Sequence, residues 1–231
     1  MLHLHRLTIL FCIILLASCN SENMESKSFD YLALGDSYTI GESVDVNERY
    51  PLQLKDSLQK NNISISNLKI VAKTGWTTDE LSAGIDSTEL LDSYDLVTLL
   101  IGVNNQYRGR DLDNYRKEFT ELLRRAIQFA NDEPEKVIVI SIPDWGVTPF
   151  AEGRDTAKIA KEIDAFNSVN YEESIKAGVH YVDVTAISRE ARINKELIAE
   201  DGLHPSGIMY SAWTEKLLPV ATQILEKKNN K

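Results

Sequence analysis

Tyr31-Leu32-Ala33-Leu34, followed directly by Gly35-Asp36-Ser37, is the stretch that most constrains the fold of this 231-residue chain. A short apolar run that ends in turn residues is typical of a buried strand. Similar runs, rich in β-branched residues, occur at residues 68–72, 96–101, 137–142 and 179–184. They alternate with longer segments of helical period, the pattern of a parallel sheet covered by helices on both faces. The chain is therefore predicted to form an α/β fold, a three-layer α/β/α sandwich around a five-stranded, flavodoxin-like parallel sheet.

Apolar residues at three- and four-residue spacing predict amphipathic helices between and after these strands. The clearest stripe runs from Leu112 to Ala130. A second lies at Ile159 to Phe166, and Gly178 suits the C-terminal turn of that helix. A final helix follows Pro205. Because no repeat or linker interrupts this pattern, one domain over residues 29–231 is the simplest prediction.

The first residues of the chain differ from the rest. An apolar stretch, residues 7–17, follows a basic start and is too short to span a bilayer comfortably, so residues 1–18 are predicted to be a signal peptide. The stretch ends in Leu16-Ala17-Ser18-Cys19, which resembles a bacterial lipobox. This resemblance implies a lipid on Cys19 and a polar tether over residues 19–28.

We therefore expect an exported lipoprotein, periplasmic or at the cell surface, that meets the membrane only through its lipid anchor. Several acyl chains give stable attachment where one chain gives only marginal binding. The alternative is a soluble secreted protein that is cut at a nearby small residue and keeps Cys19 as a free thiol. The second cysteine, Cys12, lies inside the predicted signal peptide, so neither interpretation includes a disulfide.

The composition excludes several classes of function. Lys and Arg total 25 against 35 Asp and Glu, a net charge of -10, and no basic run could neutralise a phosphate backbone. The chain has too few histidines and no ligand spacing for a metal site, and no glycine-rich loop of the nucleotide-binding kind. We therefore expect no nucleic-acid partner, no metal and no cofactor.

Ser37 is the first candidate catalytic residue. It follows the first predicted strand, and ligands bind at the carboxyl ends of strands in open parallel sheets. Taken alone, Gly-Asp-Ser is weak evidence, because these residues populate ordinary turns.

Asp201-Gly202-Leu203-His204-Pro205 is the second candidate element. A serine hydroxyl needs a base to remove its proton, and an imidazole held by a carboxylate does this well near neutral pH. A histidine at a helix entry beside a capping aspartate is the ordinary alternative. His180 begins the fifth predicted strand, where a structural role is expected, so His204 is the predicted base.

Four blocks of this sequence occur in the order found in the SGNH hydrolases, also called the GDSL family, and the chain resembles that family over most of its predicted domain. The blocks are Leu34-Gly35-Asp36-Ser37, Gly75 in Lys73-Thr74-Gly75-Trp76, Gly102-Val103-Asn104-Asn105, and Asp201-Gly202-Leu203-His204. The resemblance implies a catalytic triad of Ser37, Asp201 and His204. It also implies an oxyanion hole made by the backbone N–H groups of Ser37 and Gly75 and the side chain of Asn104.

One position departs from the family pattern, because Asn105 stands where the family usually has Asp. We expect that carboxylate to be supporting rather than chemical, and the choice of oxyanion donor between Asn104 and Asn105 stays open. Trp76, Tyr107 and Trp145 are predicted to line the substrate pocket, with loop anchoring as an equally good interpretation. Arg108 is a candidate ligand for a substrate anion, although a pairing with nearby acids is commoner.

The expected function is hydrolysis of carboxylic esters, acyl or acetyl, through an acyl-serine intermediate, on a small-molecule or glycan substrate. The sequence keeps two alternatives: acyl transfer to a glycan hydroxyl by the same residues, and a non-catalytic binding module at the cell surface. Oligomeric state is not predicted.

Overall fold

Five parallel strands form one sheet in the order β2-β1-β3-β4-β5, which is the flavodoxin-like order. The computed structural model describes residues 28–227, so the predicted signal peptide and the predicted lipid site at Cys19 lie outside the described residues. The strands are β1 (Ser28–Gly35), β2 (Ser64–Ala72), β3 (Leu96–Leu100), β4 (Val137–Ile140) and β5 (His180–Val182). The fold class predicted from the sequence is confirmed.

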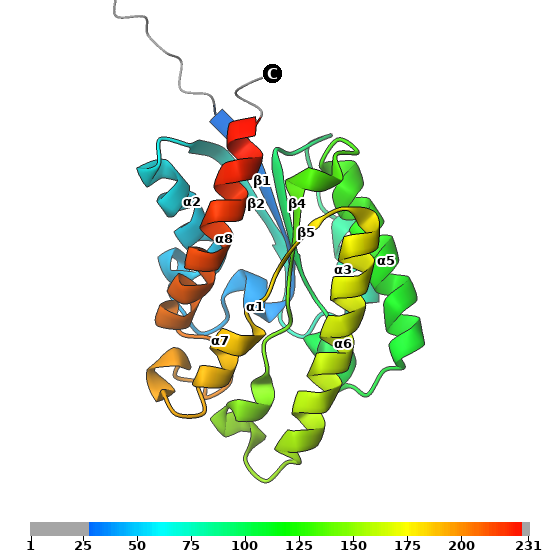
Figure 1. Ribbon diagram of the computed structural model, residues 1–231, viewed down its shortest axis with the longest axis vertical. Coiled ribbons are helices and arrows are strands. Elements are labelled where there is room, and N and C mark those ends of the chain that lie inside the picture. The colour runs from blue at the N-terminus through cyan, green and yellow to red at the C-terminus, as the bar shows by residue number, and fades with distance from the viewer. Residues whose placement is uncertain (1–27, 228–231) are drawn as a thin grey trace, which may run out of the picture.

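Helices cover both faces of the sheet (Figure 1). One face carries α2 (Tyr50–Lys60) and α8 (Gly207–Lys227), and the other carries α3 (Thr78–Asp86), α5 (Leu112–Phe129) and α6 (Thr156–Ala177). Three short helices complete the order: α1 (Ser37–Ile40), α4 (Val103–Tyr107) and α7 (Thr185–Glu190). In the view of Figure 1, β1 begins at the top and α1 lies well below that point, towards the carboxyl ends of the strands.

The helix boundaries agree with the sequence signals. The Leu112 to Ala130 stripe becomes α5, and the side chain of Asp111 caps its start by accepting the N–H of Asn114 at 2.9 Å. Gly178 ends α6 in a left-handed conformation, with φ +75°. The first strand starts at Ser28, one residue before the predicted domain boundary.

The turn from β1 into α1 depends on a glycine. A Cβ added at Gly35 would lie 2.1 Å from the hydroxyl of Thr39 and 2.4 Å from the carbonyl oxygen of Leu100. Both distances are far inside van der Waals contact, so only glycine fits between α1 and β3. The close approach fixes where Ser37 emerges from the sheet.

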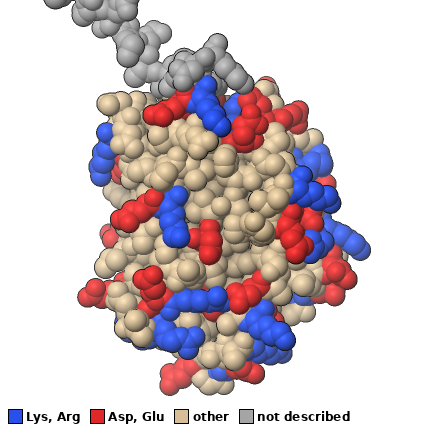
Figure 2. Space-filling view, in the orientation of Figure 1, with Lys and Arg blue, Asp and Glu red and all other residues tan. Residues whose placement is uncertain are grey.

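Charges of both signs are mixed on the face shown in Figure 2, without an extended basic area. None of the helices within residues 28–227 is long and apolar enough to cross a membrane.

Candidate active site

Ser37 is the first residue of α1 and is 4% exposed. Asp36 caps the helix, because its carboxylate accepts the N–H of Tyr38 at 3.0 Å. Gly41 ends the helix in a left-handed conformation and donates its N–H to the carbonyl of Ser37. The serine is therefore held in a single short turn at the carboxyl end of β1.

His204 and Asp201 come from one tight turn. The imidazole Nδ1 lies 2.5 Å from Oδ2 of Asp201. The other carboxylate oxygen, Oδ1, accepts the backbone N–H groups of Leu203 and His204, both at 2.9 Å. Gly202 makes the turn possible with a φ of +72°. The structure thus joins the predicted base and its predicted carboxylate partner.

The Asp201 carboxylate is held in its ionised form. Partial burial works against the charge, but the hydrogen bonds from His204, Leu203 and Ser43 outweigh it and lower the pKa of Asp201 to about 2. His204 is only 7% exposed, and the ring of Tyr38 meets it edge-on at a centroid distance of 5.6 Å. A buried imidazole beside a fixed anion is well placed to accept and carry a proton.

The two other predicted blocks reach the same edge of the sheet. Gly75 has a φ of +85°, a conformation that other residues rarely adopt. Asn104 lies in α4, directly after β3, and its amide nitrogen donates to the carbonyl of Trp76 at 3.0 Å. Because this nitrogen carries two hydrogens, the bond to Trp76 orients the amide and leaves one N–H for another acceptor.

One cavity of about 160 Å³ brings these residues together. Its walls include Ser37, Gly75, Asn104 and His204, which come from four separate segments of the chain. Its other walls are Tyr38, Thr74, Val103, Tyr107, Trp145, Phe150 and Leu203. The cavity therefore places a hydroxyl, an imidazole and the two predicted oxyanion residues around one small space.

Asn105 has a different place. It is fully buried, its Oδ1 accepts the N–H of Thr78 at 3.1 Å, and its Nδ2 donates to the hydroxyl of Thr78 at 2.7 Å. Both polar ends of the amide are used inside the protein, and Asn105 does not line the cavity. Of the two adjacent amides, Asn104 is the one that can meet a substrate.

Three aromatic rings form one wall of the cavity. Tyr107 and Trp145 were predicted to line it, whereas Phe150 was missed, and the three centroids lie 5.4 to 6.1 Å apart. The guanidinium of Arg154 lies over all three rings at 5.1 to 5.4 Å from the centroids. The only sequence signal for Phe150 was its position in the loop after β4, close behind Trp145.

Trp76 packs away from the cavity, and Arg108 pairs with a nearby acid. The ring of Trp76 covers Gly84 of α3, where an added Cβ would be 2.1 Å from the indole. Trp76 is not among the described residues that line the cavity, so the expectation of a substrate contact is corrected to a packing role. Arg108 donates to the carbonyl of Gly75 at 2.6 Å and pairs with Glu80 at 3.2 Å, the commoner of the two roles considered for it.

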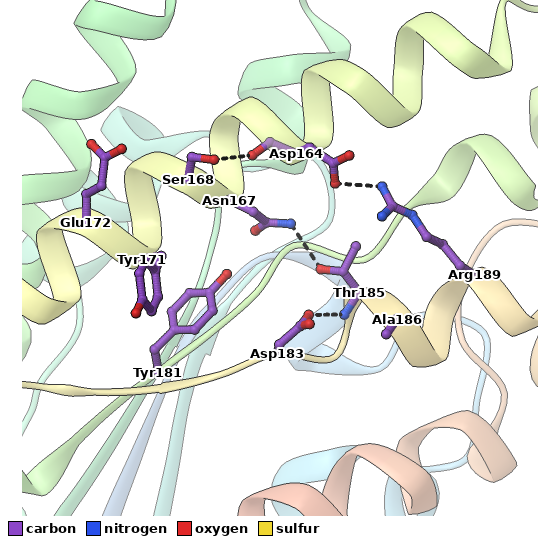
Figure 3. Close-up of a pocket in the computed structure, with 10 residues that line it drawn as sticks. All are labelled: Asp164, Asn167, Ser168, Tyr171, Glu172, Tyr181, Asp183, Thr185, Ala186 and Arg189. Atoms are coloured by element: carbon purple, nitrogen blue, oxygen red, sulfur yellow. Dashed lines mark hydrogen bonds and ion pairs between the residues drawn. The ribbon is translucent and has the colours of Figure 1, made fainter.

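A larger groove of about 910 Å³ lies between α6, β5 and α7 (Figure 3). Its polar groups bind one another: Arg189 pairs with Asp164 at 2.7 Å, and Asp183 accepts the N–H of Thr185 at 2.8 Å. Ser168 donates its hydroxyl to the carbonyl of Asp164 at 2.9 Å, and no histidine is among the described residues that line this groove. Without a nucleophile beside a base, this groove lacks the means for ester chemistry, despite its size.

No group of His, Cys, Asp and Glu within residues 28–227 is arranged to hold a metal ion.

No curated protein matches the chain. Solved structures share the fold at low identity: a lipase/acylhydrolase from Enterococcus faecalis has a TM-score of 0.67 at 19% identity, covering 86% of this chain and 96% of that one. The acetylxylan esterase Axe2 from Geobacillus stearothermophilus gives 0.61 at 20%, covering 87% and 96%. Phospholipase A1 from Streptomyces albidoflavus NA297 gives 0.62 at 19%, covering 85% and 99%.

The sequence also matches a family over most of its length. Residues 33–212 match the GDSL-like Lipase/Acylhydrolase family, a stretch that contains every residue of the cavity walls described above. The chain therefore belongs to the GDSL-like lipase/acylhydrolase family and is a carboxylic ester hydrolase.

Proposed function

We propose that this chain hydrolyses short-chain carboxylic esters through an acyl-Ser37 intermediate. The observation that carries the proposal is the cavity that Ser37 and His204 share, with Nδ1 of His204 bound to Asp201 at 2.5 Å. A serine hydroxyl becomes a nucleophile when an oriented base accepts its proton, and a carboxylate on the far nitrogen of the imidazole supplies that orientation.

In the first half of the reaction, His204 takes the proton of Ser37 as the serine oxygen attacks the ester carbonyl. The imidazolium then gives this proton to the leaving alcohol, and the acyl group stays on Ser37. In the second half, His204 takes a proton from water as the water attacks the acyl group. The imidazolium then returns this proton to the departing serine oxygen, which releases the acid and restores the serine. Asp201 stays ionised throughout, in keeping with its lowered pKa of about 2.

Negative charge develops on the carbonyl oxygen in both halves. The proposed donors to that oxygen are the N–H groups of Ser37 and Gly75 and the free amide hydrogen of Asn104. Support comes from the shared cavity and from the hydrogen bond that fixes Asn104 on the Trp76 carbonyl. Donors that are fixed in advance stabilise an oxyanion without reorganising during the reaction.

The size of the cavity supports a short acyl chain. Pockets that take drug-sized ligands measure about 300–1,000 Å³, whereas this cavity measures about 160 Å³. Tyr107, Trp145 and Phe150 close one side with apolar surface, which suits the hydrocarbon part of an acyl group. The leaving alcohol then lies towards solvent, where its size is less restricted.

The proposal is tested with a fluorophosphonate probe and with p-nitrophenyl acetate. We expect the probe to label wild type, and we expect Ser37→Ala and His204→Ala each to reduce turnover by more than about a thousandfold. Ser168→Ala is the matched control, because this exposed serine has a backbone acceptor and no imidazole. Wild-type turnover in Ser37→Ala would overturn the proposal.

We also propose that Cys19 carries a lipid and anchors the enzyme to a bacterial membrane, with residues 1–18 removed as the signal peptide. The support is the Leu16-Ala17-Ser18-Cys19 sequence after an apolar stretch. Expression with a radiolabelled fatty acid tests it: wild type should become labelled and fractionate with membranes, and Cys19→Ser should do neither.

A further inference from the structure

The Asp201 carboxylate receives one hydrogen bond from outside its own turn. Its Oδ1 is occupied by backbone N–H groups of the turn, and its Oδ2 by Nδ1 of His204. The hydroxyl of Ser43, 158 residues away in sequence, also donates to Oδ2, at 2.8 Å. Within residues 28–227, this is the only hydrogen bond that joins the Asp201 side chain to another part of the chain.

Ser43 lies in the segment of chain that directly follows the nucleophile, Ser37. It stands six residues after Ser37. The backbone N–H groups of Gly41 and Glu42 both donate to the carbonyl of Ser37, so the start of this segment is fastened to the nucleophile itself. The segment therefore connects the residue that attacks the ester with the carboxylate that orients the base.

The same segment also contacts the loop of Gly75. The hydroxyl of Thr74 donates to a carboxylate oxygen of Glu42, the neighbour of Ser43. Residues 41–43 thus link three of the four blocks that line the cavity. A side chain in this position can set how these blocks lie relative to one another.

The backbone of Ser43 is unusual for its residue type. Its φ is +64°, and the other described non-glycine residues with positive φ are Asn62, Asn131 and Asp132. Asn and Asp tolerate the left-handed region, whereas serine adopts it less readily. Ser43 adopts this strained conformation while its hydroxyl donates to the carboxylate of Asp201. Backbone strain of this kind is often found at functional sites, which points to a role for this hydrogen bond.

We propose that Ser43 is a positioning residue for ester hydrolysis, whose hydroxyl holds the Asp201 carboxylate in line with the imidazole of His204 and shares its negative charge. The inference rests on the proposed function, because it assigns Ser43 a role only through Asp201 and His204. Ser43 is exposed, so water can partly replace its hydroxyl. The expected effect is therefore smaller than the loss of a triad member.

The first experiment separates the hydroxyl from the backbone conformation. Ser43→Gly removes the donor and relaxes the backbone, so we expect unchanged or higher stability but roughly tenfold lower kcat on p-nitrophenyl acetate, with KM nearly unchanged. Ser43→Asn keeps a donor and tolerates the left-handed φ, so it should recover most of the loss. Asn62→Gly, a relaxed left-handed residue between α2 and β2, is the matched control and should keep wild-type kcat.

The pH profile reports on the charge of the carboxylate. Without the Ser43 hydroxyl, the full charge of Asp201 faces the imidazolium and favours it, so the acid limb of kcat/KM should move to higher pH in Ser43→Gly and return in Ser43→Asn.

A double-mutant cycle with Asp201→Ala adds a second criterion. If Ser43 acts through Asp201, Ser43→Gly should cost little in the Asp201→Ala background, whereas independent, additive losses would overturn the inference.

A spectroscopic measurement keeps this inference distinct from the proposed function. The proton between His204 and Asp201 gives a downfield NMR signal that does not depend on turnover, and Ser43→Gly should shift or broaden it while Asn62→Gly leaves it in place. A wild-type protein that neither turns over esters nor binds the fluorophosphonate defeats the proposed function. A Ser43→Gly variant with wild-type kcat, pH profile and NMR signal overturns the role of Ser43 alone.

Discussion

Asn105 and Thr78 are joined by two hydrogen bonds that tie α4 to the first residue of α3. The N–H of Thr78 donates to Oδ1 of Asn105 at 3.1 Å, and Nδ2 of Asn105 donates to the Thr78 hydroxyl at 2.7 Å. That hydroxyl in turn donates its only hydrogen to Glu118. It therefore needs a donor from Asn105, which an amide supplies and an ionised carboxylate does not. The departure from the usual Asp of the family is explained by this chain of hydrogen bonds.

The first prediction follows from this chain. Asn105→Asp should lower the free energy of unfolding by about 2 kcal/mol at pH 8, because a buried carboxylate would lack a hydrogen to donate and would lie near the Glu118 charge. The loss should shrink at pH 5, where a protonated Asp can donate. Urea unfolding at both pH values measures it, with Asn61→Asp on the surface as the control. Equal stability of Asn105→Asp and wild type at pH 8 would contradict the explanation.

Removal of the Asn104 amide should impair catalysis, whereas removal of the Asn105 amide should impair stability. Asn104→Ala should lower kcat by roughly a hundred- to a thousandfold, because it deletes a proposed oxyanion donor. Asn105→Ala should lower the unfolding midpoint in urea and leave kcat within a few-fold of wild type, because this amide serves only Thr78. Steady-state kinetics on p-nitrophenyl acetate, corrected for the folded fraction, distinguish the two. A larger loss of kcat in Asn105→Ala than in Asn104→Ala would contradict the assignment of Asn104 as the oxyanion donor.

Asp36, next to the nucleophile, should make stability depend on pH. It is fully buried, its Oδ2 has no hydrogen-bond partner among the described residues, and burial raises its pKa to about 7 from an ordinary 3.8. Between these two values the folded protein binds more protons than the unfolded chain, so this group makes stability fall as pH rises through that window. The full penalty is present above about pH 7 and is at most about 4 kcal/mol, at 1.36 kcal/mol per pKa unit.

Asp36→Asn removes this titration and keeps a capping side chain. The variant should therefore gain stability over wild type between pH 5 and pH 8, as measured by urea unfolding at each pH. A difference between the two proteins that stays constant over this range would show that Asp36 does not titrate there. Asp56→Asn, an exposed site in α2, serves as the control and should show no such trend.

The sequence predicts those site residues that have reactive side chains and stand next to a recognisable strand or helix. Ser37 could be placed because it follows a recognisable strand, and His204 because it stands just before a recognisable helix. In a parallel sheet, segments that follow the strands gather at one edge. Phe150 and Ser43 could not, because their roles depend on how an irregular loop folds over a distant residue. The direction of the Trp76 ring was likewise set by a distant partner, the gap above Gly84, and no local pattern reports such a gap.

The aromatic wall should set the acyl chain length. Phe150 is 41% exposed and forms one side of the cavity, so Phe150→Ala should open that side and raise kcat/KM for p-nitrophenyl octanoate relative to the acetate. Tyr171→Ala is the matched control, since this aromatic residue, 52% exposed, lies in the groove beside α6. An unchanged preference in Phe150→Ala would place the acyl chain elsewhere.

The last prediction concerns the proposed lipid on Cys19. β1 runs for eight residues from Ser28 towards Ser37, which is about 26 Å at roughly 3.3 Å per residue. If residues 19–28 act as the polar tether expected from the sequence, their mean reach is only about 15–18 Å, and the anchor should keep the edge that carries Ser37 turned away from its own membrane. Enzyme anchored in vesicles should therefore hydrolyse a water-soluble acetate ester as fast as Cys19→Ser does in solution, but should act poorly on a short-chain ester lipid in the same bilayer.

Insertion of about twenty Gly and Ser residues after residue 24 should raise activity on the bilayer ester alone, because the longer chain lets the domain turn over. Equal activity on the bilayer ester with the short and the long tether would show that the anchor does not set the direction of the site.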